Sequence, residues 1–159
     1  MLKGYQYKLK IDIYIIEKNN KIYAITTNNK YEYIQEETAL IKEAARQLNE
    51  YFNGERKVFD LPLDLTGTSF QTKVWQELLK IPYGETKSYK DVAIAINNPK
   101  ACRAVGMANN KNRIMIVVPC HRIIGSNKKL VGYAGGLKLK EQLLNLEKIL
   151  IKKTQFNSL

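Results

Sequence analysis

The chain has 159 residues, which suits one domain or two small ones, and 45% of them are hydrophobic, which excludes a disordered protein. No apolar stretch approaches the ~20 residues needed to cross a bilayer, so we expect no membrane span. The net charge of +11 is unevenly distributed, because residues 1–66 carry ten basic and ten acidic side chains, whereas residues 67–159 carry sixteen basic and five acidic ones. A charge excess in one half favours nucleic acid as the partner. An anionic membrane is less favoured, because the sequence has no strongly basic amphipathic helix.

The first half of the sequence predicts a small sheet with a helix. Residues 7–28 alternate aliphatic and polar side chains around Asn19 and Asn20, which indicates a β-hairpin whose turn tolerates positive φ. Apolar residues recur at helical spacing over residues 38–54, and Asn53-Gly54 ends that helix. Residues 59–67, "FDLPLDLTG", have no helical period and predict an extended linker.

The second half begins with two helix-start signals. Thr68 stands three residues before Gln71, as in a capping box, at the head of an apolar helical pattern that Pro82 ends. Ser88 is a cap for a short helix over residues 89–96.

Pro99 opens a second short helix that runs through residue 109, across a tight polar turn. Two short helices so arranged in the basic half indicate a helix-turn-helix. Residues 114–118 predict a buried strand, residues 132–136 a glycine loop, and residues 137–150 an amphipathic final helix.

Together these elements predict an α+β fold with two domains. A small N-terminal domain over residues 1–64 combines a β-hairpin or sheet with a helix, and a mostly helical C-terminal domain over residues 65–151 contains the helix-turn-helix. Residues 152–159 form a flexible tail.

The dipeptide Cys120-His121 is the strongest chemical signal, because His121 is the only histidine and apolar residues flank the pair. A thiolate, not a thiol, is the nucleophile, and His121 is the only imidazole that could act as its base. Consecutive side chains of an extended segment point to opposite faces, so their contact needs a sharp turn or a bridging water. A histidine base needs an orienting partner, for which Glu147 is best placed among the acids.

The sequence also allows purely structural roles for these residues. Cys120 could be a buried small hydrophobe and His121 a structural residue, and we assign a structural role to Cys102. One histidine and two cysteines separated by 17 intervening residues lack the paired spacing of zinc ligands, so we expect no metal. Nothing marks export, so we expect free thiols and a cytoplasmic protein.

Four stretches together resemble the O6-alkylguanine-DNA alkyltransferases, also called methylated-DNA–protein-cysteine methyltransferases. They read "FDLPLDLTGTSFQTKVWQELLKIPYGETKSY", "NNPKACRAVG", "NKNRIMIVVPCHRI" and "GYAGGLKLKEQLLNLE", and the resemblance covers roughly residues 48–147. The resemblance implies DNA repair by an irreversible, single-turnover transfer of an alkyl group from guanine O6 to Cys120. By analogy His121 withdraws the thiol proton through a water, Glu147 orients His121, and Asn112 braces the active-site turn.

The resemblance also implies that the damaged nucleotide is flipped out of double-stranded DNA. Tyr89 matches the residue that promotes flipping, and Arg103 the one that fills the vacated space. Small residues of the recognition helix, Ala108 among them, would permit close approach to the sugars. Further matches are Lys90, Asn98 and Ser126 for backbone contacts and Tyr133, Ile123 and Ala134 for the base pocket. We expect no cofactor and a monomer; cooperative binding on DNA and activity on O4-alkylthymine stay open.

Three other functions stay possible from the sequence. A lesion sensor would flip the base without accepting the alkyl group, although non-reactive relatives have tryptophan in place of the cysteine. A cysteine hydrolase would turn over many times and would not need the basic half. A transcriptional helix-turn-helix would require sequence-specific affinity, which small recognition-helix residues hardly support.

Overall fold

The computed structural model describes residues 1–125 and 129–149, and the chain divides into two compact units. The first unit comprises Met1–Leu65 together with Arg113–Val117, and the second comprises Thr66–Asn112 and the chain from Val118 onward. The main division lies one residue from the boundary predicted from the sequence. The prediction did not foresee that residues 113–117 belong to the first unit.

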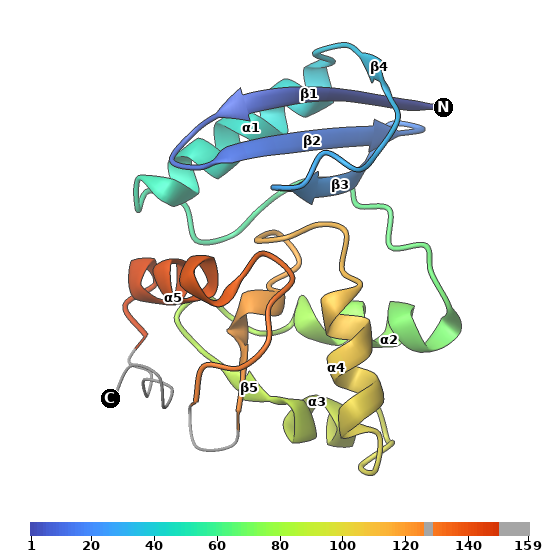
Figure 1. Ribbon diagram of the computed structural model, residues 1–159, viewed down its shortest axis with the longest axis vertical. Coiled ribbons are helices and arrows are strands. Elements are labelled where there is room, and N and C mark those ends of the chain that lie inside the picture. Colours follow the sequence, from blue (N-terminus) through green and yellow to red (C-terminus); the bar gives the residue numbers. More distant parts are fainter. Residues whose placement is uncertain (126–128, 150–159) are drawn as a thin grey trace. The chain divides into compact units, whose positions relative to one another are not determined.

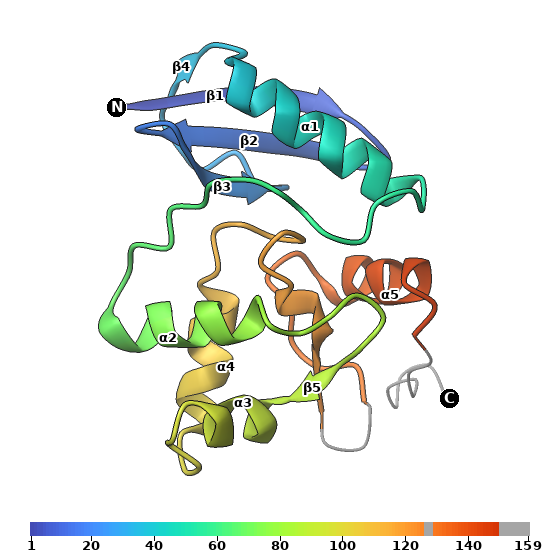
Figure 2. The ribbon, with the colours of Figure 1, turned by 180° about the vertical axis from the view of Figure 1, so that it is seen from behind.

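The first unit is a four-stranded sheet with one long helix against it (Figures 1 and 2). The strands β1 (Leu2–Lys8), β2 (Asp12–Lys18), β3 (Lys21–Thr26) and β4 (Ile34–Gln35) lie in the order β3-β2-β1-β4, and the helix is α1 (Ala39–Phe52). The three longer strands pair antiparallel, whereas β4 runs parallel to β1. The core lies between α1 and the sheet and includes fully buried Ile13, Ile15, Ile22, Ile41, Leu48 and Tyr51.

Local signals in this unit are confirmed. Asn19 and Asn20 take φ values of 50° and 63° between β2 and β3, as a two-residue hairpin turn requires. The helix ends at Phe52 with Asn53 as its C-cap. The linker is extended and is held at two points: buried Gln47 exchanges hydrogen bonds with the backbone of Asp60, and Leu63 bridges to Ile22.

The strand predicted over residues 114–118 is wrong. Only Ile114 makes a bridge, to Ile25 of β3, with Ile25 N donating to Arg113 O at 2.8 Å and Met115 N donating to Ile25 O at 3.0 Å. The chain then turns, and Ile116 takes φ 73°, which is unusual for a β-branched residue. The burial of the segment is as expected, because an apolar run indicates burial without fixing the backbone.

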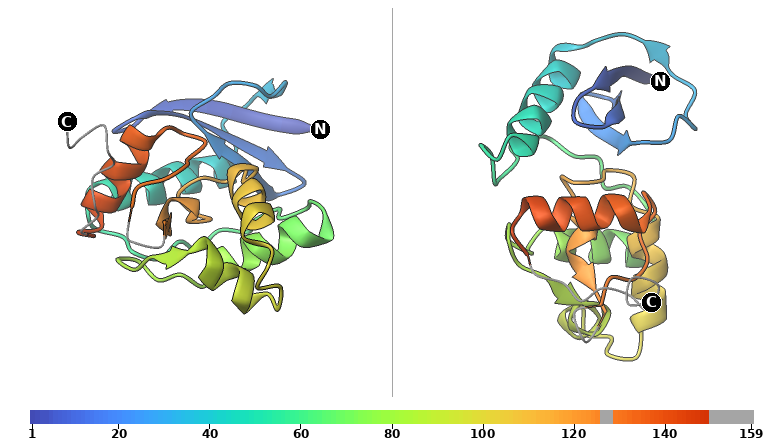
Figure 3. Two further views of the ribbon diagram at one scale, coloured as in Figure 1. Left: turned by 60° about the horizontal axis from the view of Figure 1, so that its bottom comes forward. Right: turned by 60° about the vertical axis from the view of Figure 1, so that its left-hand side comes forward.

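The second unit is mostly helical, as predicted. Its helices are α2 (Ser69–Leu78), α3 (Tyr89–Ala95), α4 (Cys102–Asn110) and α5 (Leu137–Leu146), with a 3₁₀ turn η1 (Cys120–Arg122) and a short parallel pair of β5 (Lys87–Ser88) and β6 (Ile123–Ile124). The η1–β6 segment, orange in Figures 1 to 3, lies between α5 and α4. The indole N–H of Trp75 donates to Ala108 O at 2.9 Å and joins α2 to α4.

Both capping predictions in this unit are confirmed. Thr68 and Gln71 form a complete capping box on α2, and Ser88 and Asp91 form another on α3. The helix predicted to open at Pro99 begins instead at Cys102, because Ala101 N donates to Asn98 O and closes a turn first. A proline suits the first position of a helix and the second position of a turn equally well, so its fixed φ could not distinguish them.

The glycine loop and the last helix follow the prediction in part. Gly132 and Gly136 have φ values of 45° and 96°, which favour glycine, and Gly136 leads into α5. The helix ends at Leu146, earlier than expected, with Glu147 as its C-cap. Ser126 and the predicted tail over residues 152–159 lie outside the described residues. Within the described part of the chain, no helix has the length and apolarity to span a membrane.

Candidate active site

Cys120 and His121 lie in the sharp turn that their chemistry requires. Cys120 N donates to Val118 O at 2.7 Å and Arg122 N donates to Pro119 O at 2.9 Å, which winds the chain into η1 directly after the proline. The side chain of Cys120 is buried at 4% exposure and that of His121 at 0%. The second thiol, Cys102, is half-buried at the start of α4 and is also free.

Two asparagines brace this turn. Asn112 Nδ2 donates to Cys120 Sγ at 3.1 Å and to Val118 O at 2.9 Å. Asn109, buried on α4, donates to the carbonyl of Cys120 at 3.4 Å. Of these two asparagines, Asn112 is therefore the one that contacts the sulfur itself.

Burial dominates the electrostatics of the thiol. Loss of hydration raises the pKa of Cys120, while the hydrogen bond from Asn112, the charge of Lys140 and a hydrogen bond from Tyr133 act in the opposite direction without reversing it. The resting thiol is therefore neutral, and a base is needed to generate the thiolate.

His121 is oriented as such a base would need to be. Its Nε2 lies 2.7 Å from Oε2 of Glu147, and both side chains are fully buried. Its Nδ1 is also buried and has no hydrogen-bond partner among the described residues. Burial lowers the pKa of His121, so the imidazole is neutral and one nitrogen is left to accept a proton.

Arg122 belongs to this cluster, although sequence reasoning gave it no role. Its Nε donates to Glu147 Oε1 at 2.9 Å and its Nη2 to Glu147 Oε2 at 3.2 Å, while its Nη1 donates to Ile81 O at 2.7 Å. The signal available was an arginine between two apolar runs, because a guanidinium that is buried must be paired.

Lys140 is a second residue that sequence reasoning missed. It is fully buried, and its Nζ donates to Val131 O at 2.6 Å and Gly132 O at 2.9 Å. Burial lowers the pKa of this lysine to about 8. Its position, three residues after Leu137 and three before Leu143, places it on the apolar face of α5, which is the signal that could have found it.

Tyr89, predicted to promote flipping, and Tyr133, predicted for the base pocket, both lie near the sulfur. Tyr89 opens α3, its hydroxyl donates to Val131 O at 3.5 Å, and its pKa is raised by burial and by the neighbouring Cys120. Tyr133 is half-buried and interacts with the thiol. Ile123 is fully buried after η1, whereas Ala134 is exposed in the glycine loop.

The residues predicted to contact DNA are not gathered around Cys120. Lys90, Asn98 and Arg103 are exposed side chains of α3, the following turn and α4. Gly106 lies against the Tyr89 ring, where an added Cβ would make an ordinary van der Waals contact at 3.7 Å, so the ring does not by itself require a glycine there. The prediction that Ala108 faces the sugars is wrong, because Ala108 is buried at 3% exposure under Trp75.

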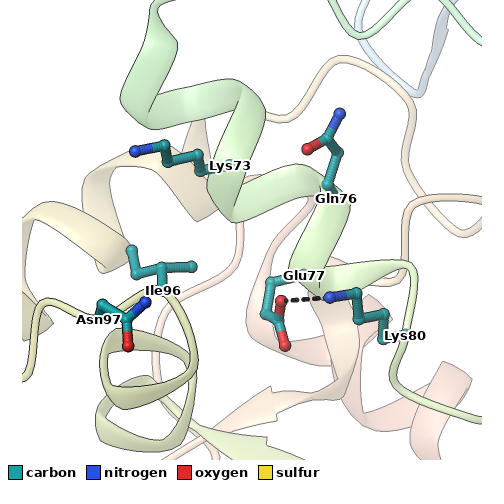
Figure 4. A pocket seen from close by; sticks show the side chains of 6 residues that line it. All are labelled: Lys73, Gln76, Glu77, Lys80, Ile96 and Asn97. Atoms are coloured by element: carbon teal, nitrogen blue, oxygen red, sulfur yellow. Dashed lines mark hydrogen bonds and ion pairs between the residues drawn. The ribbon is translucent and has the colours of Figure 1, made fainter.

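A surface hollow lies elsewhere in the second unit, between α2 and the turn after α3 (Figure 4). It measures about 420 Å³, and the ion pair between Glu77 and Lys80 lies at its side. Its lining residues are Lys73, Gln76, Glu77, Lys80, Ile96 and Asn97. None of these six is a predicted site residue, so the hollow is separate from the Cys120 cluster.

Comparison with known families and proteins matches both halves of the chain to one family. The DNA-binding domain of 6-O-methylguanine DNA methyltransferase matches residues 69–149, and its ribonuclease-like domain matches residues 6–65. The chain is 56% identical over 112 residues to the methylated-DNA–protein-cysteine methyltransferase of Methanosarcina barkeri, covering 70% of this chain and 71% of that protein. It is 57% identical over 117 residues to the constitutive enzyme of that name from Bacillus subtilis, covering 73% and 71%.

Solved structures agree with these matches. The O6-methylguanine methyltransferase of Mycobacterium tuberculosis superposes with a TM-score of 0.86 at 42% identity, covering 93% of both chains. A structure titled as Mycobacterium tuberculosis OGT in complex with DNA superposes with a TM-score of 0.86 at 41% identity, covering 92% of both. The chain therefore belongs to the 6-O-methylguanine DNA methyltransferase family, which repairs DNA by transferring an alkyl group to one of its own cysteines.

Proposed function

We propose that Cys120 is the cysteine that receives the alkyl group, and that its source is O6 of guanine in double-stranded DNA. The observation that carries this proposal is that a buried thiol and a buried imidazole, which a buried carboxylate orients, are neighbours in one 3₁₀ turn. His121 takes the thiol proton at Nδ1 through a water, and Glu147 holds Nε2. Asn112 donates to the sulfur and favours its anionic form.

The transfer is a displacement at the alkyl carbon. The thiolate of Cys120 forms a carbon–sulfur bond while the bond from that carbon to guanine O6 breaks, and the leaving electron pair returns to the base. Tyr89, whose raised pKa keeps its hydroxyl protonated at rest, passes its proton to the leaving guanine, and the proton that His121 took from the thiol returns to Tyr89 through solvent. The product is a thioether, which water does not readily hydrolyse, so each molecule reacts once.

DNA binding belongs to the basic helix-turn-helix in this proposal. Arg103 fills the space left by the flipped nucleotide, Tyr89 promotes the flip, and Lys90, Asn98 and Ser126 contact the backbone. Exposure of Lys90, Asn98 and Arg103 on α3, α4 and the turn between them supports these roles. Tyr133, Ile123 and Ala134 form the pocket around the base, with Ile123 and Ala134 acting through their backbone groups.

The same proposal covers the compartment, the oligomeric state and the roles of the two domains. The protein acts in the cytoplasm as a monomer and needs no cofactor or metal. Residues 1–64 stabilise the structure, while residues 65–151 bind DNA and carry the chemistry. O4-alkylthymine is a second substrate to test beside O6-alkylguanine.

Intact-mass spectrometry tests the reaction directly. After incubation with a duplex containing O6-methylguanine, we expect the protein to gain one methyl group on Cys120, in proportion to the lesions repaired. Cys120→Ala should gain none, whereas the matched variant Cys102→Ala should react as the native protein does. Unmodified protein after complete repair would refute the proposal, and binding without repair would indicate a lesion sensor.

A further inference from the structure

The Glu147 carboxylate is held by more than the histidine. Its Oε1 accepts from Arg122 Nε at 2.9 Å and from Gly84 N at 3.1 Å. Its Oε2 lies 2.7 Å from His121 Nε2 and accepts from Arg122 Nη2 at 3.2 Å. A carboxylate has about four acceptor sites, so this one is fully occupied, and Arg122 fills half of it.

Arg122 brings a permanent positive charge into the cluster. Its side chain is almost completely buried, and its remaining terminal nitrogen is tied to Ile81 O. Its guanidinium also lies 5.8 Å from the centre of the Tyr83 ring. Because a guanidinium does not lose its proton in a protein, this charge is present at every pH at which the protein folds.

That charge opposes the effect of the carboxylate on the imidazole and acts in the same direction as burial. A buried carboxylate alone beside a histidine favours the imidazolium, which has no free nitrogen to take a proton. Burial lowers the pKa of His121 most, Glu147 acts to raise it, and Arg122 and Lys140 act to lower it. Tyr83 is the other titratable group beside the Arg122–Glu147 pair, and Cys120 precedes the histidine on η1.

We propose that Arg122 is a positioning residue, which neutralises Glu147 and thereby keeps His121 uncharged, with its proton on Nε2 and its Nδ1 free. The ionised carboxylate can only accept a hydrogen bond, so Nε2 must donate. The final consequence, that Nδ1 accepts the thiol proton of Cys120, rests on the proposed function. The charge and tautomer of His121 do not depend on it.

The single histidine makes the test direct, because nitrogen NMR of ¹⁵N-histidine-labelled protein reports His121 alone. In the native protein we expect a neutral ring protonated on Nε2 from pH 6 to pH 8. In Arg122→Gln we expect the titration midpoint to rise by about 1 to 3 pH units, as expected when a neighbouring like charge is removed. Arg122→Lys retains a cation and should keep the ring neutral at pH 7.

Arg56 offers a matched control. Its Nε donates to Glu50 Oε1 at 2.8 Å and its Nη1 to Val58 O at 2.7 Å, so it too joins a carboxylate to a backbone carbonyl, outside the site and with a single bond to the carboxylate. Arg56→Gln should leave the His121 spectrum and the reaction rate unchanged. The second measurement is the rate of reaction with free O6-benzylguanine as a function of pH. This rate should rise with pH as His121 becomes neutral, and in Arg122→Gln the rise should occur at higher pH than in the native protein.

Three results would each overturn the proposal. The first is a native His121 that titrates near its ordinary value of about 6.5. The second is a folded Arg122→Gln protein, verified by circular dichroism, whose histidine remains neutral as in the native protein. The third is an Arg122→Lys protein that titrates like Arg122→Gln, and this arm decides the matter if the glutamine variant does not fold. A failure of alkyl transfer in the native protein would refute the proposed function and leave the NMR result standing.

Discussion

Replacing Asn112 by alanine removes the hydrogen bond to the sulfur and one to the Val118 carbonyl. A hydrogen bond to a charged group contributes about 1.5–3 kcal/mol, so its loss should raise the thiol pKa by about 1–2 units. At any pH below the thiol midpoint, the rate of reaction should then fall about 10- to 100-fold. The Val118 carbonyl loses one of its two donors but keeps the bond from Cys120 N, so the free energy of unfolding should fall by only about 0.5–1.5 kcal/mol.

The assay measures these two effects separately. The pH dependence of the rate with free O6-benzylguanine gives the thiol titration without any contribution from DNA binding, and urea unfolding gives the stability. Asn109→Ala is the matched control, since buried Asn109 braces the same turn but bonds to the Cys120 carbonyl rather than to its sulfur. The control should lose stability and keep the thiol titration. An Asn112→Ala protein with an unchanged thiol titration, or a control with the same shift, would refute the reasoning.

Three further predictions follow from the same structure. Arg103→Ala should slow repair in duplex DNA by about tenfold or more but leave reaction with free O6-benzylguanine unchanged, because only the duplex requires flipping; equal losses would mean that Arg103 supports the fold. The pKa of Lys140 is about 8 in the folded protein and about 10.5 in the unfolded chain, so between these values the unfolded chain binds more protons and Lys140 makes the free energy of unfolding rise with pH. The urea unfolding midpoints at pH 7.5 and pH 10 should therefore differ less in Lys140→Met than in the native protein. Ser88→Ala should cost about 1 kcal/mol in urea unfolding, as Thr68→Ala should, because each side chain caps a helix.

The sequence predicted best what local chemistry decides. Asn19-Asn20 specifies a hairpin turn, and Thr68 and Ser88 specify helix starts, since each interaction joins residues at most three apart. The family motif then identified Cys120 and His121 as the reactive neighbours, and the structure shows both side chains buried in one 3₁₀ turn.

What the sequence could not predict depends on distant contacts. The path of residues 113–117 is fixed by pairing with Ile25, almost 90 residues earlier, so an apolar run looked like an ordinary strand. The role of Arg122 appears only when Glu147 and Ile81 approach it from two other segments. The position of Lys140 on the apolar face of α5 indicates its burial, but the two loop carbonyls that accept from its ammonium group could not be identified from the sequence.

The bond from Trp75 to Ala108 has a practical consequence. Trp75 is the only tryptophan in the chain, it is almost fully buried, and its indole is fastened to the backbone of α4. Intrinsic fluorescence excited at the indole therefore comes from one site, on α2 and in contact with α4, one of the two helices that the proposed function places on DNA. The native protein thus contains its own optical reporter, with which docking on a duplex can be followed in real time without attaching a dye.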